Sequence, residues 1–159
     1  MNITEIDNAI DTILKEHESK RICCLKLQDA LRSFYHPAFL KTSYYVPVDS
    51  IPKPQVSGPG FEDFLQIAVD GITYKDTYFI KTEYQSNIIL HLHELVHVAQ
   101  WRKLGSIAFL SRYIQEIQSC GYDGSSLENM AREAQGLFES SSEVVDLEQW
   151  VYAKLIDET

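Results

Sequence analysis

The residues with the clearest potential for chemistry lie in one short stretch, His93-Glu94-Leu95-Val96-His97, which matches the pattern HExxH. An α-helix turns about 100° per residue, so two histidines four positions apart project within about 40° of each other. Their imidazoles can therefore provide two of the three protein ligands of an open catalytic zinc site. Glu94 follows the first histidine directly, and its carboxylate can reach a water molecule on the metal and act as general base.

The residues around this motif strengthen the prediction of a metal site. A chance occurrence of HExxH in a chain of this composition has an expectation of about 0.01. Apart from the motif's own histidines and glutamate and one further histidine, residues 88–98 are apolar, which predicts a buried helix. Buried imidazoles need polar partners. The alternative interpretation is a pair of core histidines with satisfied hydrogen bonds beside a glutamate at the edge of a helical bundle.

A third metal ligand has to come from the acidic residues that follow the motif. Carboxylate oxygens complete zinc sites of the His₂Glu type. Spacing alone does not choose among the candidates, which are Glu116, Asp123, Glu128, Glu133, Glu139, Glu143, Asp146 and Glu148.

The second half of the chain resembles the small bacterial gluzincins called minimal zincins, in which HELxHxxQ is followed by an aromatic-rich helix and a Glu-x-x-Ala-Arg segment. The resemblance covers about residues 64–135 and rests on HELVHVAQW at 93–101, Gly105, FLSRY at 109–113, Gly121-Tyr122 and LENMAR at 127–132. It implies that Glu128 completes the zinc site, with Glu133 as the competing candidate. Asn129-Met130 departs from the family pattern, which more often has a charged residue before the alanine.

The motif and the resemblance together predict a zinc-dependent hydrolase, a metallopeptidase acting on a peptide or protein substrate. Zinc-bound water would attack a peptide carbonyl, with Glu94 as general base. Tyr122, or alternatively Tyr113, could stabilise the oxyanion, because both lie between the two halves of the zinc site in the sequence. An extended substrate would add to a sheet edge, for which residues 77–80 are the candidate strand because they resemble the family's edge hairpin.

Two other interpretations stay open. A non-catalytic zincin-fold module could bind zinc or a docking partner without turnover, although a structural site needs no base and usually has a fourth protein ligand, such as Cys120 or Asp123. In a zymogen-like state, the proline-rich segment 37–59 would cover the cleft. His91 should face away from the metal, and Trp101 is expected in the core, with a role in a substrate pocket as the alternative.

The elements that would position these residues form a single α+β domain over 1–159, zincin-like, with a small antiparallel sheet or hairpin beside a helical bundle that carries the HExxH helix. Its predicted parts are a helical N-terminal part (1–36), a proline-rich loop (37–60), a β-hairpin region (61–85) and a helical zinc-site part (86–156). The hairpin would reverse at Asp70-Gly71 or Lys75-Asp76. Helices are predicted at 4–18, 22–34, 86–103, 106–119, 125–138 and 141–156, and strands at 44–48, 64–69 and 72–80.

Charge and cysteine content limit the expected partners and location. The 159 residues contain 14 Lys and Arg against 23 Asp and Glu, a net charge of −9. This balance argues against binding nucleic acid or an anionic membrane, since both need basic residues. No apolar run approaches the roughly 20 residues that span a bilayer, and the first residues do not resemble a secretory signal. Three cysteines, two of them adjacent (Cys23 and Cys24), predict a cytoplasmic protein without a disulfide framework. The sequence leaves the oligomeric state open.

Overall fold

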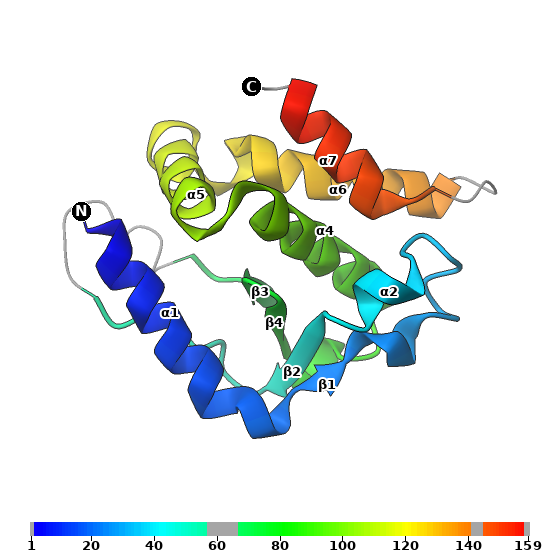
Figure 1. The fold of residues 1–159 in the computed structure, drawn as a ribbon, viewed down its shortest axis with the longest axis horizontal. Coiled ribbons are helices and arrows are strands. Elements are labelled where there is room, and N and C mark those ends of the chain that lie inside the picture. The colour runs from blue at the N-terminus through cyan, green and yellow to red at the C-terminus, as the bar shows by residue number, and fades with distance from the viewer. Residues whose placement is uncertain (1, 57–66, 141–144, 158–159) are drawn as a thin grey trace.

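The computed structural model describes residues 2–56, 67–140 and 145–157, and these residues form an α+β fold, as predicted. Figure 1 shows the helices and strands in space. The helices are α1 (Ile3–His17), α2 (Pro37–Leu40), α4 (Ile88–Leu104), α5 (Ser106–Cys120), α6 (Ser126–Ser140) and α7 (Leu147–Asp157). The strands are β1 (Ile22–Cys23), β2 (Tyr44–Val48), β3 (Gly71–Tyr74) and β4 (Thr77–Lys81). Short 3-10 turns lie at Glu18–Lys20, Cys24–Leu27, Thr82–Tyr84 and Tyr122–Gly124.

The four strands form one mixed sheet in the order β1-β2-β4-β3. The predicted hairpin is present as β3 and β4, which pair antiparallel and reverse at Lys75-Asp76. Lys75 has a φ of 61°, a left-handed conformation that this tight reversal requires. The sheet as a whole is mixed and not antiparallel throughout, because β2 joins β4 in parallel while β1 pairs with β2 antiparallel. Of the predicted strand at 64–69, residues 64–66 lie outside the described residues and 67–69 are not in a strand.

The edge of the sheet next to α4 is β3, not the strand at 77–80 that the sequence suggested. β4 is an inner strand with β2 on one side and β3 on the other. In Figure 1, β3 and β4 lie between α4 and α1, and β3 packs against α4. The residues that face the HExxH motif from the sheet therefore come from β3.

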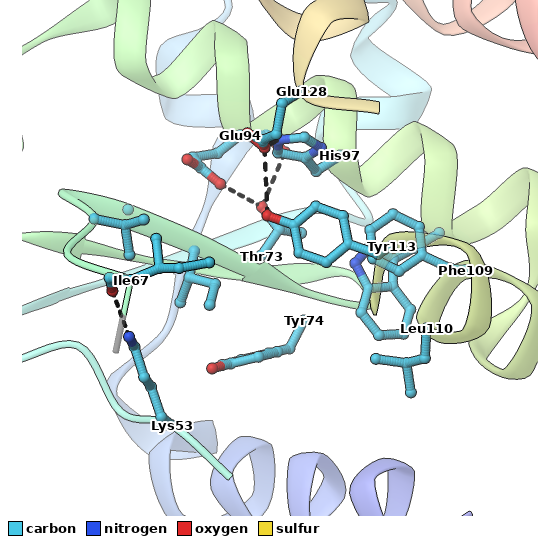
Figure 2. Close-up of a pocket in the computed structure, with 14 residues that line it drawn as sticks. Lys53, Ile67, Thr73, Tyr74, Glu94, His97, Phe109, Leu110, Tyr113 and Glu128 are labelled. Atoms are coloured by element: carbon cyan, nitrogen blue, oxygen red, sulfur yellow. Dashed lines mark hydrogen bonds and ion pairs between the residues drawn. The ribbon is translucent and has the colours of Figure 1, made fainter. Parts of the chain in front are cut away.

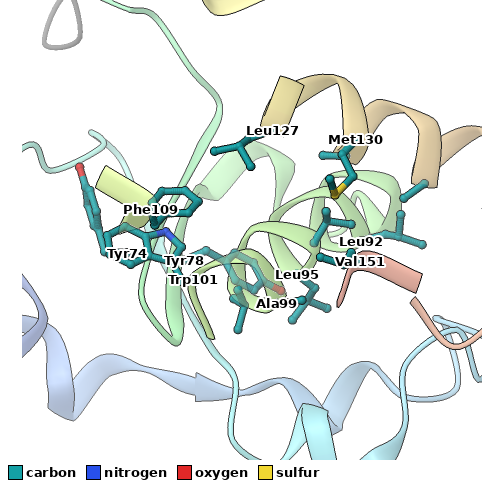
Figure 3. Packing of buried hydrophobic residues seen from close by; sticks show 14 of the residues in the cluster. Tyr74, Tyr78, Leu92, Leu95, Ala99, Trp101, Phe109, Leu127, Met130 and Val151 are labelled. Atoms are coloured by element: carbon teal, nitrogen blue, oxygen red, sulfur yellow. The ribbon is translucent and has the colours of Figure 1, made fainter. Parts of the chain in front are cut away.

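Helix α4 occupies the centre of the molecule, with the sheet on one side and α5, α6 and α7 on the other (Figure 1). Every residue from His91 to Trp101 is buried, which is typical of a helix covered on all sides. The Asn87 side chain accepts a hydrogen bond from the Leu90 amide at the start of α4, and Gly105 ends it with a φ of 82°. Figure 3 shows Leu92, Leu95 and Ala99 of α4 packed with residues of α6 and α7.

The N-terminal part differs from the prediction in one element. The helix predicted at 22–34 is absent, because Ile22 and Cys23 pair with β2 and the following residues form a 3-10 turn and further turns. Arg32 and Ser33 have φ values of 51° and 68°, which no right-handed helix contains. The helices predicted at 4–18, 86–103, 106–119 and 125–138 and the strand at 44–48 are confirmed within two residues.

The C-terminal helix α7 begins at Leu147, later than the prediction of 141–156, whose first four residues lie outside the described part of the chain. None of the helices described here combines the length and the apolar character that crossing a bilayer would require.

Candidate metal centre

Three buried side chains meet between α4 and α6, and they are His93, His97 and Glu128. One ligand atom from each lies within 4.8 Å of the others. The two imidazole Nε2 atoms are 3.2 Å apart, and the Glu128 carboxylate lies 3.2 Å from His93 Nε2 and 2.9 Å from His97 Nε2. The structure thus brings Glu128 to both histidines of the motif.

Two glutamine side chains fix the orientation of both imidazoles. His93 Nδ1 lies 2.5 Å from Gln135 Oε1, and His97 Nδ1 lies 2.7 Å from Gln100 Oε1. An amide oxygen only accepts, so each Nδ1 donates, and in the neutral ring each Nε2 presents a lone pair to the cluster. The polar partners that the buried imidazoles need are thus amides, one of them three positions after His97 and the other on α6.

This donor arrangement fits a divalent metal ion. Two lone pairs and a carboxylate that face one another at about 3 Å repel each other unless a cation lies between them, either a proton or a metal ion. Burial opposes the charged form of His97, yet the Glu128 carboxylate outweighs it and raises the pKa of His97 to about 9. Burial likewise opposes ionisation of Glu128, but His97 and His93 hold its pKa well below its usual range. The cluster attracts positive charge, and two imidazoles with one carboxylate form a donor set that suits Zn²⁺ and other first-row divalent ions.

Glu94 lies beside the cluster with its carboxylate held by the sheet. Thr73 of β3 donates a hydrogen bond to Glu94 Oε2 over 2.7 Å. A Cβ atom on Gly71 would lie 2.9 Å from Glu94 Oε1, so a side chain at position 71 would force the carboxylate to shift. Burial raises the pKa of Glu94 above its ordinary value, although both histidines lower it in part. Burial therefore favours the protonated form of Glu94 more than it does for an exposed glutamate.

Both candidate tyrosines lie near Glu128. Tyr113 Oη lies 3.5 Å from Glu128 Oε2, at the limit of a hydrogen bond. Tyr122 is half-buried, and the Arg132 guanidinium lies 5.6 Å from the centre of its ring. Burial, followed by the Glu128 carboxylate, raises the pKa of both phenols. A catalytic role for Tyr122 or Tyr113 stays a prediction.

Several other sequence candidates lie away from the cluster. Glu133 is exposed and pairs with Lys154 over 3.1 Å. Cys120 is exposed, and the almost fully exposed Asp123 side chain pairs with Arg132. His91 accepts a hydrogen bond at Nδ1 from the Tyr78 hydroxyl over 2.6 Å and donates from Nε2 to the Gln85 carbonyl over 2.8 Å, so its ring bonds to other groups than the cluster.

The start of α6, which carries Glu128, is held by the preceding helix. Glu116 of α5 accepts hydrogen bonds from the Ser125 and Ser126 hydroxyls over 2.9 and 2.6 Å and from the Leu127 amide over 3.3 Å. Gln100 of α4 also donates to the Leu127 carbonyl over 3.0 Å. The position of Glu128 is thus set from both neighbouring helices.

A small pocket, here called the side pocket, opens from the metal centre. Figure 2 shows Glu94, His97 and Glu128 at one end, Tyr113, Phe109 and Leu110 along one wall, and Tyr74 opposite them. Lys53 borders the pocket and donates to the Ile67 carbonyl. The remaining lining residues are Ile67, Val69, Gly71, Ile72, Thr73 and Trp101. The pocket is mostly apolar and joins the metal centre directly.

Comparisons of the chain with protein-family models, with curated proteins and with solved structures yield no match. Its chemistry has to be interpreted from the geometry of the metal centre and the side pocket.

Proposed function

We propose that this chain is a zinc-dependent hydrolase that cleaves peptide bonds, a metallopeptidase of the zincin type. The observation that carries the proposal is the buried Glu94 carboxylate beside the converging donor atoms of His93, His97 and Glu128. A site that only stabilises the fold needs no base at this place, and burying an extra carboxylate is costly. A hydrolytic site needs such a group.

The metal ion, when bound, would supply a Lewis acid for the substrate carbonyl and would lower the pKa of water. Glu94 takes the proton of the attacking water and delivers it to the leaving amine. Its environment suits both steps, because Thr73 directs one carboxylate oxygen and burial favours the protonated form. The hydroxyl of Tyr113 or Tyr122 would stabilise the oxyanion.

An extended peptide would bind along β3, the sheet edge that faces the metal centre. Its backbone would form hydrogen bonds with β3, and its side chains would alternate between the two faces of the extended sheet. Gly71 and Thr73 of β3 both lie against Glu94, so a peptide on this edge would pass next to the base.

A non-catalytic zinc or docking module is the second candidate function. It would be favoured by a fourth protein ligand, and within the described residues the cluster contains only the two histidines and Glu128, without Cys120 or Asp123. An open coordination position is typical of catalytic zinc. The zymogen-like alternative concerns segment 37–59, of which Pro52 accepts a hydrogen bond from Tyr74 and Lys53 borders the side pocket, while 57–59 lie outside the described residues.

The test is peptide turnover by the Glu94→Gln variant at matched zinc occupancy. Glutamine keeps the size of the side chain but cannot accept and release the proton, so hydrolysis should fall about 10²-fold or more while zinc content and folding persist. Glu133→Gln, which changes an exposed glutamate on α6, should behave as wild type. Equal turnover by Glu94→Gln and wild type would overturn the role of Glu94, and no turnover of a broad peptide library by zinc-loaded wild type would favour the docking module.

A further inference from the structure

Glu94 lies beside the metal centre but is not one of the groups that converge there. Within the part of the chain that the structure describes, the converging donors belong to His93, His97 and Glu128, although Glu94 directly follows His93 on α4. The Glu94 carboxylate is turned toward β3, the strand that packs against α4. The contact with β3 therefore distinguishes the proposed base from the three donors.

A hydrogen bond from Thr73 fixes one oxygen of this carboxylate. Thr73 Oγ1 donates to Glu94 Oε2 over 2.7 Å, and it also lies 3.1 Å from the Glu94 backbone carbonyl oxygen. Both residues are buried, with exposed fractions of 6% for Thr73 and 3% for Glu94. Hydrogen bonds to an ionised group are stronger than those between neutral groups, and a β-branched side chain has few χ1 rotamers. The hydroxyl therefore holds Oε2 in one direction (Figure 2).

Gly71 leaves the space that the other carboxylate oxygen occupies. Gly71 and Thr73 are two positions apart on β3, so they face the same side of the sheet. A Cβ atom at position 71 would lie 2.9 Å from Oε1 and 3.2 Å from Cδ of Glu94, which is closer than ordinary van der Waals contact. The strand thus attracts the carboxylate at Thr73 and leaves room for it at Gly71.

We propose that β3 positions the Glu94 carboxylate for proton transfer, with Thr73 as the positioning residue and Gly71 providing the room. Thr73 acts through Glu94 and not on the reacting atoms. That the positioned group is a base rests on the proposed hydrolase function, whereas the contact between β3 and Glu94 exists without turnover. A misplacement of about 1 Å can cost 10²-fold in rate, so this contact should affect kcat more than KM.

Peptide hydrolysis by Thr73→Val at matched zinc occupancy tests the role of the hydroxyl. Valine replaces the hydroxyl with a methyl group, so kcat should fall about 10- to 100-fold while KM and zinc content stay near those of wild type. Thr73→Ser keeps the hydroxyl and should retain most of the activity. Thr77→Val is the matched control, because Thr77 is also buried but lies on β4 and donates to the Asp76 carboxylate. Wild-type kcat in Thr73→Val, or an equal loss in Thr73→Ser, would overturn the proposal.

Gly71→Ala tests the same positioning by a second route. The added methyl group keeps the Thr73 hydroxyl but should displace the carboxylate, so kcat should fall as it does in Thr73→Val. The atoms that this methyl meets belong to the end of a flexible side chain, so the chain should still fold. Gly136→Ala on α6 is the control, because a Cβ atom there meets nothing within 4 Å. Wild-type kcat in Gly71→Ala would overturn the proposal, and this variant decides alone if Thr73→Val fails to fold.

A double-mutant cycle separates the contact with β3 from the proposed hydrolase. Urea unfolding of metal-free Thr73→Val, Glu94→Ala and the double variant should give non-additive losses of stability, with Thr73→Val costing less once Glu94 is absent. Additive losses would overturn the contact. Coupling without peptide turnover by wild type would support the hold of β3 on Glu94 and reject the hydrolase. Turnover that falls in Glu94→Gln but not in Thr73→Val would support the hydrolase and reject the positioning.

Discussion

At the scale of single residues, Gln100 and Gln135 determine which ring nitrogen each histidine of the candidate metal site turns toward the other donor atoms. Each amide oxygen accepts the Nδ1 proton of one histidine, so Nε2 is the atom left to bind a metal. Gln100 also donates to the Leu127 carbonyl, next to Glu128. One side chain thus connects the second histidine to the segment that carries the carboxylate.

Loss of the Gln135 amide should weaken metal binding without unfolding the chain. Gln135→Leu removes the acceptor that orients His93, and partners of this kind are typically worth 10- to 100-fold in metal affinity. Competition with a chelator of known affinity measures the change. Gln149→Leu on the exposed face of α7 is the matched control and should bind zinc as wild type does. Wild-type affinity in Gln135→Leu would contradict this role.

The choice of carboxylate can be tested by zinc content. Protein purified without chelator should contain about one zinc per chain, and His97→Ala or Glu128→Ala should lose most of it, because either removes a ligand. Glu133→Ala should retain it, since Glu133 pairs with Lys154 at the surface. The opposite ranking of the two glutamates would mean that the cluster seen between α4 and α6 is not the metal site.

The sequence predicted part of this site. His93, His97 and Glu94 follow from helical spacing alone, whereas Glu128 needed the resemblance to a family, because spacing leaves eight acidic candidates. Gln135 could not have been predicted, since its contact with His93 depends on how α6 packs on α4. The unpaired indole of Trp101 likewise appears only once the core is assembled.

At the scale of the elements, the contact between Glu116 and the start of α6 places the third donor. Burial alone would raise the pKa of Glu116, but hydrogen bonds from Ser126, Arg112 and Ser125 outweigh it and lower the pKa. A carboxylate at this point also interacts favourably with the positive end of the α6 dipole. Glu116, which belongs to α5, thus caps the start of the neighbouring helix α6.

Glu116→Gln should destabilise the chain by about 1 kcal/mol at pH 7, as expected for losing a helix cap. Because the folded-state pKa of Glu116 is lowered, the stabilisation that it provides is present above its ordinary pKa of about 4.3 and is lost as pH falls through the lowered value. Urea unfolding of chelator-treated protein at pH 7 and pH 3 measures this. The difference between wild type and variant should shrink at pH 3, and Glu139→Gln at the exposed end of α6 should show no such difference. A difference that persists unchanged at pH 3 would contradict it.

Local patterns predicted the long helices and the β3–β4 hairpin, but not how distant segments pair. Apolar residues at 88–98 are sufficient to indicate a buried helix. The helix predicted at 22–34 is absent because Ile22 and Cys23 pair with β2, a contact outside any local window. The parallel pairing of β2 with β4 has the same origin, and it makes β3 the edge strand.

At the scale of the whole molecule, a metal ion would connect α4 to α6. Zinc binds the folded chain through ligands that the unfolded chain does not hold together, so it should stabilise by about 2.7 kcal/mol at a free concentration 100 times its Kd. Thermal unfolding over a zinc series should show Tm rising with the logarithm of the concentration. His97→Ala should lose this dependence, and an unchanged dependence would contradict a metal site at this cluster.

The distance along the chain between the metal-ligand residues affects the rates of folding and unfolding. His97 and Glu128 are 31 residues apart, with all of α5 between them. A cation gains its third ligand only when α4 and α6 have docked, and we expect this docking to follow the transition state for folding. Interactions formed after the transition state slow unfolding and leave the rate of folding nearly unchanged. Bound zinc would then extend the lifetime of the native state by slowing its unfolding, while the chain would fold at nearly the same rate with or without zinc.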